Sequence, residues 1–294
     1  MVAIVLNPTS GMTRRPRMRE ELDELFRSAG IDTCMRIVPS PRETLATMRA
    51  ALDSRPTVLV AAGGDGTVSA AAAAVSGTDI PLGVLPLGTL NHFAKDAGIP
   101  IDLPKAVQVV AAGHTRRVDV GRVNDRIFVN NASIGVYPRF VEVRARLHGQ
   151  GRSKLTALAL AAVEILRREG EVVIRLQGDR TRILARTPFV FVGNNEYLAE
   201  GLTLGGRTRL DEGLLHAYYA PPVRTRDLPR LFGQALFGRA RRDRALRSMS
   251  AAEMWVDTFT HTVDVACDGE LLTLSSPLRF RSWPSALTLL CPSG

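Results

Sequence analysis

The strongest constraint on the fold is the alternation of short apolar runs with helix-like segments over the first third of the chain. Runs typical of strands lie at residues 2–6, 31–38, 57–62 and 81–85, and segments typical of helices lie between them at 18–29, 43–52 and 68–75. Such alternation indicates a parallel sheet with right-handed crossovers. Because ligands of these sheets bind beyond the carboxyl ends of the strands, we expect a site at that edge.

Three of these strands end in turn-forming sequences: Asn7-Pro-Thr-Ser-Gly11 (the first turn), Gly63-Gly-Asp-Gly-Thr67 (the second turn) and Pro86-Leu-Gly-Thr-Leu-Asn91 (the third turn). Glycines let backbone amides approach a ligand, and amides followed by a helix N-terminus form an anion nest that suits a nucleotide polyphosphate. Asp65 suits a metal ion, a ribose hydroxyl or a neighbouring amide better than a phosphate. The alternative is a tight strand-to-helix turn capped by this aspartate.

From about residue 116 the pattern changes to short strands separated by turns. These runs lie at 117–123, 127–132, 172–176, 189–193, 214–220, 254–259, 263–266 and 278–282, and one helical interval lies at 154–168. Regular short strands are typical of an antiparallel β-sandwich or a barrel-like domain. We therefore expect an α/β domain at 1–115 and a sandwich domain at 116–283. The last segment, 284–294, either closes the second domain or returns to the first.

Composition narrows the class of protein. The 294 residues are 45% hydrophobic and carry a formal net charge of +9, which excludes a disordered or fibrous chain and leaves nucleic acid, an anionic membrane or a phosphate-bearing substrate as partners. Three distant cysteines, Cys34, Cys267 and Cys291, fit no disulfide framework or paired metal site, which favours a reducing compartment. The first residues read as a strand rather than a signal peptide, so we expect a cytoplasmic protein. The longest apolar stretch, 155–166, is too short to span a bilayer.

Six motifs identify a family resemblance. The chain has neither GxxxxGK[ST] nor a GxGxxG after its first strand, which disfavours P-loop ATPases and ordinary dinucleotide dehydrogenases. It does resemble the diacylglycerol kinase catalytic family, which includes soluble bacterial diacylglycerol kinases and sphingosine and ceramide kinases. The resemblance covers nearly the whole chain, and its motifs occur in the family's order: Asn-Pro-x-Ser-Gly at 7–11, Gly-Gly-Asp-Gly-Thr at 63–67, Pro-x-Gly-Thr at 86–89, Asn-x-x-Ser-x-Gly at 130–135, Asp-Glu-Gly-Leu at 211–214 and Asp-Gly-Glu at 268–270.

The resemblance implies a nucleotide-binding α/β domain with a Rossmann-like parallel sheet, a C-terminal antiparallel β-sandwich, and an active site in the cleft between them. It also implies which residues contact the ATP phosphates: Asn7, Pro8, Thr9, Ser10, Gly11, Gly63, Gly64, Asp65, Gly66, Thr67 and Thr89. Glu270 is then the general base for the lipid hydroxyl, and Asp268 orients Glu270 or the metal. Alone, Asp-Gly-Glu would more simply be a hairpin turn with solvated carboxylates.

The segment at 210–215 resembles the part of the family that holds a structural Mg²⁺. Glu212 is the best ligand, with the backbones of Arg209 and Leu214 and the neighbouring Asp211 as helpers, although an acidic hairpin turn explains the sequence equally well. Asp119 stands where the family often has an aspartate near the nucleotide or metal. The asparagines at 130 and 131, with Ser133 and Gly135, line the cleft or tie down its loops.

Two departures from the family pattern stand near the nucleotide turns. The family usually reads Gly-Thr-x-Asn-Asp at the third turn, but this chain has His92 in the last position. A carboxylate that helps to organise metal is thus replaced by an imidazole, which we read as subfamily variation. The second departure is Val68-Ser69-Ala70-Ala71, where many relatives carry Asn or Glu; it alters either nucleotide contacts or packing alone.

Two thirds of the net charge lies in one segment. Residues 224–247 contain eight arginines and two aspartates, and apolar residues follow helical spacing at Leu228, Leu231, Phe232, Ala235 and Leu236. Such a helix could bind an anionic membrane, or it could pack on the sandwich with a solvated basic face; both can hold. Aromatic residues make up 5% of the chain and do not interleave with the basic ones, so nucleic acid is disfavoured.

Together these patterns predict an ATP- and Mg²⁺-dependent kinase of a lipid hydroxyl, most simply that of diacylglycerol, ceramide or a sphingoid base, that associates transiently with a membrane. An NAD kinase-like enzyme is the nearest alternative. A nucleotide- or lipid-binding regulator that lost catalysis through His92 is another. The sequence is also compatible with a homodimer.

Overall fold

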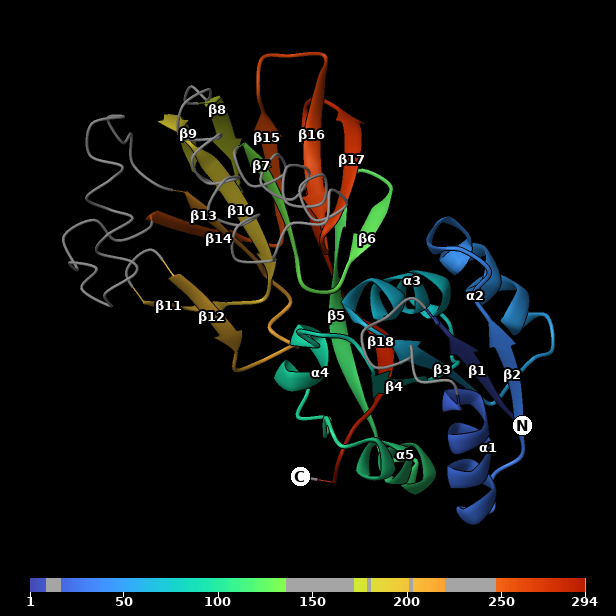
Figure 1. Ribbon diagram of the computed structural model, residues 1–294. Coiled ribbons are helices and arrows are strands. Elements are labelled where there is room, and N and C mark those ends of the chain that lie inside the picture. Colours follow the sequence, from blue (N-terminus) through green and yellow to red (C-terminus); the bar gives the residue numbers. More distant parts are fainter. Residues whose placement is uncertain (9–16, 136–171, 179–180, 201–202, 220–246, 294) are drawn as a thin grey trace, which may run out of the picture.

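The computed structural model describes residues 1–8, 17–135, 172–178, 181–200, 203–219 and 247–293. The described chain forms an α/β part and a β-sandwich part, which Figure 1 shows one above the other. The α/β part contains β1 (Val2–Leu6), α1 (Met18–Ser28), β2 (Thr33–Ile37), a 3₁₀ turn η2 (Pro41–Glu43), α2 (Thr44–Leu52), β3 (Val58–Gly63), α3 (Asp65–Val75), β4 (Leu82–Pro86), α4 (His92–Asp96) and α5 (Leu103–Ala112).

The rest of the chain is built from strands. They are β5 (Thr115–Val123), β6 (Arg126–Phe128), β7 (Asn131–Gly135), β8 (Val172–Gln177), β9 (Arg182–Thr187), β10 (Phe189–Asn194), β11 (Tyr197–Glu200), β12 (Thr203–Arg207), β13 (Leu215–Tyr219), β14 (Arg247–Ala251), β15 (Glu253–Asp257), β16 (Thr262–Cys267), β17 (Glu270–Ser275) and β18 (Leu278–Leu290). The predicted helix at 154–168 and residues 224–246 of the basic segment lie outside the described residues.

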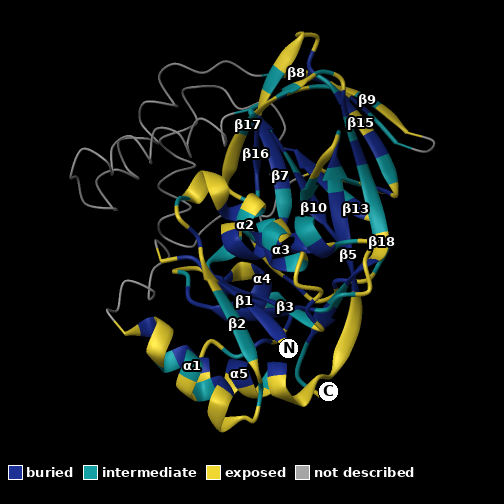
Figure 2. Cartoon of the chain, turned by 90° about the vertical axis from the view of Figure 1, so that its right-hand side faces the viewer, coloured by how far each residue is buried: buried dark blue, intermediate teal, exposed yellow. Residues whose placement is uncertain are grey.

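The four predicted N-terminal strands form a parallel sheet in the order β2-β1-β3-β4, as expected from their alternation with helices. Helices α2 and α3 cover one face, and α1 and α5 lie together on the other (Figure 1). Because both faces are covered, β1 and β4 are buried along their whole length. Figure 2 shows the same arrangement: buried strands lie inside, and exposed residues of α1 and α5 face outward.

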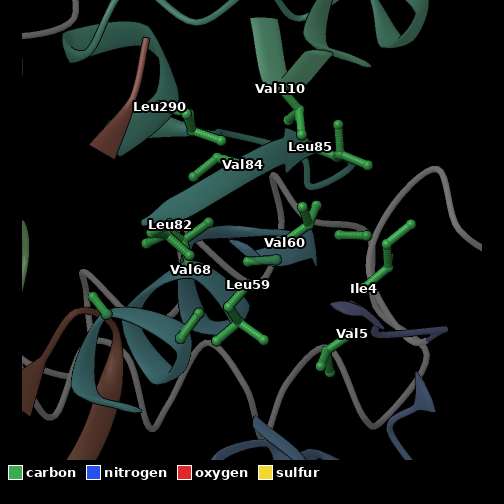
Figure 3. Close-up of a cluster of buried hydrophobic side chains, with 14 of the residues drawn as sticks. Ile4, Val5, Leu59, Val60, Val68, Leu82, Val84, Leu85, Val110 and Leu290 are labelled. Carbon is green, nitrogen blue, oxygen red and sulfur yellow. The ribbon is translucent and has the colours of Figure 1, made fainter. Parts of the chain in front are cut away.

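The core of this part is mainly aliphatic. Ile4 from β1, Val60 from β3 and Leu85 from β4 are fully buried. Figure 3 shows Leu290 of β18 beside Val84, so the C-terminal end of the chain contributes to the same core. Burying such a side chain stabilises the fold by about 1.5–3 kcal/mol.

The second part is an antiparallel sandwich, as predicted. One layer has the strand order β14-β13-β10-β7-β16-β17, and the other contains β18-β15-β8-β9 with β5 paired to β18. Alternate residues of these strands point inward, such as Ile174 and Leu176 on β8, and form a second hydrophobic core with Val190, Val265 and Phe280.

Strand β18 joins the two parts. The sequence left open whether residues 284–290 close the sandwich or return to the first domain, and the structure places them against the parallel sheet, with Leu289 beside Leu82 of β4. The preceding residues of the same strand pair with β15. An irregularity between Trp283 and Leu287 separates the two stretches, which explains why two runs were predicted where one strand of 13 residues exists.

The single strand predicted at 127–132 is wrong, because the structure has two strands there. β6 ends at Phe128 and β7 begins at Asn131, because the backbone amides of Val129 and Asn130 turn away from the ladder to the carboxylate of Asp268. The helix predicted from Val68 begins earlier, at Asp65, so the second turn itself forms the first turn of α3.

Some elements were not predicted, and α5 is one whose signal is readable in the sequence. Asp102 caps it by accepting a hydrogen bond from the backbone of Lys105, a proline stands in its first turn, and Gly113 ends it in the left-handed conformation. Among the described residues, no helix combines the length and apolar character that crossing a bilayer requires.

Candidate active site

The first and second turns meet at the carboxyl ends of β1 and β3. Asn7 is buried, and its side-chain amide donates to the hydroxyl of Thr67 over 3.0 Å. Its backbone amide donates to the carbonyl of Ala62, so the end of β1 stays paired with β3. Pro8 is exposed beside it, and the remaining predicted contacts of the first turn, Thr9, Ser10 and Gly11, lie outside the described residues.

The third turn packs directly on the second. The backbone amide of Leu87 donates to the carbonyl of Gly63, and a Cβ added to Gly88 would lie 2.5 Å from the Cα of Gly64. The side chain of Asn91, a residue in the left-handed conformation, accepts from the amide of Gly88 and donates to the carbonyls of Pro86 and Gly88. Asn7 of the first turn, the second turn and the third turn therefore converge, and Thr89 is exposed at their surface.

The N-terminus of α3 is open to solvent at Gly66. Gly66 is exposed in its first turn, and a Cβ added there would meet nothing within 4 Å. Backbone amides at a helix N-terminus attract anions. The carboxylate of Asp65 accepts a hydrogen bond from the backbone amide of Phe93 over 3.2 Å. A metal ion, a ribose hydroxyl and a neighbouring amide were the expected partners of Asp65, and the contact in the structure is with an amide. This bond ties α3 to α4.

Asp268 lies where the two parts of the molecule meet. Its Oδ1 accepts from the amides of Asn130 and Asn131, and its Oδ2 accepts from the amide of Val129 and the hydroxyl of Ser69. Burial raises the pKa of Asp268, and the hydrogen bonds from Ser69 and the backbone amides oppose that rise. These donors fill the lone pairs of the carboxylate, so Asp268 is placed to orient its neighbours rather than to bind a metal.

The position of Ser69 connects the second turn to the Asp-Gly-Glu turn. Ser69 stands three residues after Gly66 on α3, which corresponds to a rise of about 4.5 Å. The bond from Ser69 therefore brings Asp268 within about one helical turn of the open glycine. Ser69, which belongs to the second departure from the family pattern, thus makes one of the contacts between the two parts of the molecule.

Glu270 begins β17, where it pairs with Cys267 across the hairpin from β16. Glu270 is exposed, and the turn before it has positive φ at both Asp268 and Gly269. The hairpin predicted by Asp-Gly is therefore present, but only Glu270 of its two carboxylates is free to face solvent. Burial raises the pKa of the Cys267 thiol, which keeps it neutral.

Polar groups of the acidic loop at 211–214 form hydrogen bonds and ion pairs with other residues of the protein. Oε2 of Glu212 accepts from the amide of Glu196 and lies 3.4 Å from Nε2 of His216, and the carbonyl of Leu214 accepts from the amide of Asn195. Arg209 pairs with Asp211 at the surface. No group of three or more His, Cys, Asp and Glu side chains is placed to hold a metal ion within the described residues.

Asp119 ties this acidic loop to β18. Its carboxylate accepts from the amides of Gly213 and Ser285, and its own amide donates to the carbonyl of Leu210. His92, the departure at the third turn, is exposed at the start of α4.

Arg207 is a central residue that the sequence patterns did not indicate. Its guanidinium, which is fully buried, contacts Asp96 of α4 over 2.7 Å and donates to the carbonyls of Val129 and Asn194 and the side chain of Asn130. The ring of Tyr197 lies 5.4 Å from it, and burial raises the pKa of Tyr197 to about 12. A single arginine in a polar stretch carries no signal of such burial, so only tertiary contacts identify it.

Comparisons with known proteins agree with this two-part arrangement. The family model described as "Diacylglycerol kinase catalytic domain" matches residues 1–123, and that described as "YegS C-terminal NAD kinase beta sandwich-like domain" matches residues 135–291. A diacylglycerol kinase of Staphylococcus carnosus is 29% identical over 71% of this chain and 69% of its own length. A Klebsiella pneumoniae protein named as a YegS-like probable lipid kinase is 28% identical over 94% of this chain and 92% of its own.

The same fold is present in a solved structure. The crystal structure of a diacylglycerol kinase from Bacillus anthracis strain Sterne superposes with a TM-score of 0.69, covering 99% of this chain and 96% of that one at 18% identity, which establishes the likeness of fold. One family model covers the parallel-sheet part and the other the sandwich, so almost the whole length is accounted for. The chain therefore belongs to the diacylglycerol kinase catalytic-domain family of lipid kinases.

Proposed function

We propose that this protein transfers the γ-phosphate of ATP, with Mg²⁺, to the hydroxyl of a membrane lipid, diacylglycerol or a related lipid such as ceramide or a sphingoid base. The observation that carries the proposal is the hydrogen bond between Ser69 of α3 and Asp268. It holds the Asp-Gly-Glu turn beside the helix whose N-terminus forms the phosphate-binding candidate. A carboxylate next to a phosphate site is the arrangement that phosphoryl transfer to an alcohol needs.

In this proposal Glu270 is the general base and Asp268 orients it. Glu270 takes the proton of the lipid hydroxyl while the alcohol oxygen bonds to the γ-phosphorus, and the bond from that phosphorus to the ADP oxygen breaks. The turn backbone connects Asp268 directly to Glu270, so the hydrogen bonds on Asp268 restrict where the base can lie. Positioning is the main contribution of the protein to this reaction class.

The residues described at the turns fit the nucleotide. The open space over Gly66 and the N-terminus of α3 suit phosphate oxygens, and Asn7 and Thr67 brace the second turn from behind. Mg²⁺ would neutralise charge on the β- and γ-phosphates. Oxygen ligands such as Glu212 suit Mg²⁺ chemically, but Glu212 already contacts Glu196 and His216, so the described loop does not present a metal donor set and the structural Mg²⁺ site stays a prediction.

The partner proposed for the basic segment is an anionic membrane. Residues 224–246 lie outside the described residues, so the support is their sequence: arginines and apolar residues at helical spacing. A kinase of a membrane lipid has to reach its acceptor at a bilayer surface, and basic residues contribute about 1 kcal/mol each to binding an anionic surface.

The test replaces Glu270 by Gln and measures transfer of labelled phosphate from ATP to a panel of lipids. Loss of the base should lower kcat by about 10²–10⁴-fold and leave ATP affinity within about twofold, because Gln keeps the shape but cannot accept the proton. Glu20→Gln, the same change at an exposed position of α1, is the control that should retain full activity.

Each outcome of this assay distinguishes the functions considered. Undiminished turnover by Glu270→Gln would refute the role of the base, and ATP binding without phosphorylation of any lipid would refute the lipid kinase. Phosphorylation of NAD⁺, included in the panel, would favour the NAD kinase-like alternative. Activity near zero that rises strongly in His92→Asp would favour the regulator.

A further inference from the structure

Arg207 stands at the junction of four separate parts of the chain. From the end of β12 its guanidinium contacts α4 through Asp96, the segment between β6 and β7 through Val129 and Asn130, and the end of β10 through Asn194. The side chain has no exposed surface. A cation buried at this depth is stable only when it is paired and hydrogen-bonded, so these partners must keep their places around it.

The partners of Arg207 are also the partners of Asp268. The amides of Val129 and Asn130 donate to Asp268, while the carbonyl of Val129 and the side chain of Asn130 accept from Arg207. The segment of residues 129–130 is therefore held from both sides. A displacement on the Arg207 side moves the amides that hold Asp268.

These contacts close a ring around the candidate site. The carboxylate of Asp268 accepts a hydrogen bond from Ser69 of α3. The carboxylate of Asp65, at the start of α3, accepts one from the backbone amide of Phe93 in α4. Helix α4 ends at Asp96, which pairs with Arg207, and Arg207 returns the chain of contacts to Asp268 through residues 129–130. The second turn and the Asp-Gly-Glu turn thus belong to one connected polar network.

We propose that Arg207 is a positioning residue for phosphoryl transfer: it holds residues 129–130, and through them Asp268, so that Glu270 stays aligned with the phosphate-binding turn. The proposal rests on the lipid kinase function proposed above. It adds to that function a residue that touches neither nucleotide nor lipid but on which the geometry of the base depends.

The planar guanidinium matters because its three nitrogens donate hydrogen bonds in different fixed directions. Nε meets Asp96, one terminal nitrogen meets the carbonyls of Val129 and Asn194, and the other meets Asn130. A lysine ammonium can keep the ion pair with Asp96, but a single nitrogen cannot span these directions. Arg207→Lys therefore separates charge compensation from alignment.

The test measures kcat and KM for ATP in Arg207→Lys, in Glu270→Gln and in the double variant. We expect Arg207→Lys to lower kcat by about 100-fold with KM for ATP within about twofold, because small misplacements of a reacting group cost that much. We expect the double variant to have the residual rate of Glu270→Gln within about twofold, because residues that act as one unit are not additive.

Arg279→Lys is the matched control. Arg279 also pairs with a carboxylate, Glu253, over 2.6 Å and lies 5.2 Å from the ring of Trp255, but it belongs to the far layer of the sandwich. Its kcat should equal that of the unchanged protein. If Arg207→Lys does not fold, Asn130→Ala, which removes one acceptor and keeps the pair with Asp96, should lower kcat by about tenfold or more and show the same non-additivity with Glu270→Gln.

The proposal is overturned if the losses in Arg207→Lys and Glu270→Gln multiply in the double variant, if Arg207→Lys raises only KM for ATP, or if its kcat is unchanged. Failure of the lipid kinase function is a different result, since the unchanged protein would then phosphorylate no lipid. Failure of the base assignment is also separate, since Glu270→Gln would then retain its rate while the unchanged protein is active.

Discussion

Asp268 shows how a single carboxylate can set the path of the backbone around it. It accepts from the amides of Val129 and Asn130, which lie between β6 and β7, and from the amide of Asn131 at the start of β7. Without this acceptor, each of these part-buried amides would lose its partner, at a cost of up to about 1–3 kcal/mol. Asp-Gly-Glu is therefore a structural joint as well as the carrier of the proposed base, and loss of Asp268 should affect folding and activity together.

Alanine at two glycine positions of the turns should have opposite effects on the free energy of unfolding. Gly88→Ala places a Cβ 2.5 Å from Gly64 and 2.7 Å from Asn91, so it should lower the free energy of unfolding by about 1–3 kcal/mol. Gly66→Ala meets no atom within 4 Å and should leave stability unchanged or raise it by up to about 1 kcal/mol, since alanine favours a helix.

The same Gly66→Ala should weaken ATP binding, because the methyl group fills the space proposed for phosphate. Urea unfolding and calorimetric titration with ATP measure the two quantities on the same variants. A Gly66→Ala protein that binds ATP as tightly as the unchanged protein would contradict the placement of the phosphates.

At the scale of elements, the informative cases are those in which a helix or strand begins or ends for a tertiary reason. Helix α3 starts inside the glycine-rich turn, which places its N-terminus and Ser69 on the site. Strand β7 starts late because the preceding amides are taken by Asp268. Propensity and periodicity do not report these boundaries, since the partners are distant in sequence.

The amphipathic segment supplies a prediction at the same scale. Replacing Arg239, Arg241 and Arg242 by Gln should weaken binding to vesicles of anionic phospholipid by about 100-fold, from about 1 kcal/mol per charge. Vesicle flotation at low and high salt measures it, and binding should weaken with salt.

Arg175, Arg182 and Arg186, which lie on β8 and β9, provide a triple variant with the same change of charge as a control. Equal losses in the two triple variants would show that general charge, rather than the segment, determines membrane binding.

At the scale of the whole molecule, β18 joins the two parts by backbone pairing, from which we expect them to unfold together. It pairs with β15 of the sandwich at one end and reaches β4 at the other, and β5 accompanies it along both stretches. The polar network crosses the same boundary twice, where Arg207 pairs with Asp96 of α4 and where Asp268 accepts from Ser69 of α3. The two parts therefore share backbone pairing as well as side-chain contacts.

Leu289→Ala tests this cooperativity. Leu289 is fully buried, and its truncation should cost about 2–5 kcal/mol and destabilise both parts in one transition. Urea unfolding followed by tryptophan fluorescence, which reports on Trp255 and Trp283, should coincide with that followed by circular dichroism. Leu184→Ala, at a residue that is 71% exposed, should change stability by less than about 0.5 kcal/mol. Two separate transitions would contradict the single unit.

The sequence by itself determined the alternating parallel sheet, the later sandwich and the meeting of Asn7 with the second and third turns, because apolar periodicity and turn chemistry are local properties. Its family motifs pointed to Glu270 and Asp268. Tertiary structure alone decided that residues 284–290 return to the first sheet, that Ser69 binds Asp268 and that Arg207 is buried. Those outcomes depend on pairing between residues far apart in the chain, and a polar side chain acquires its role only when such partners surround it.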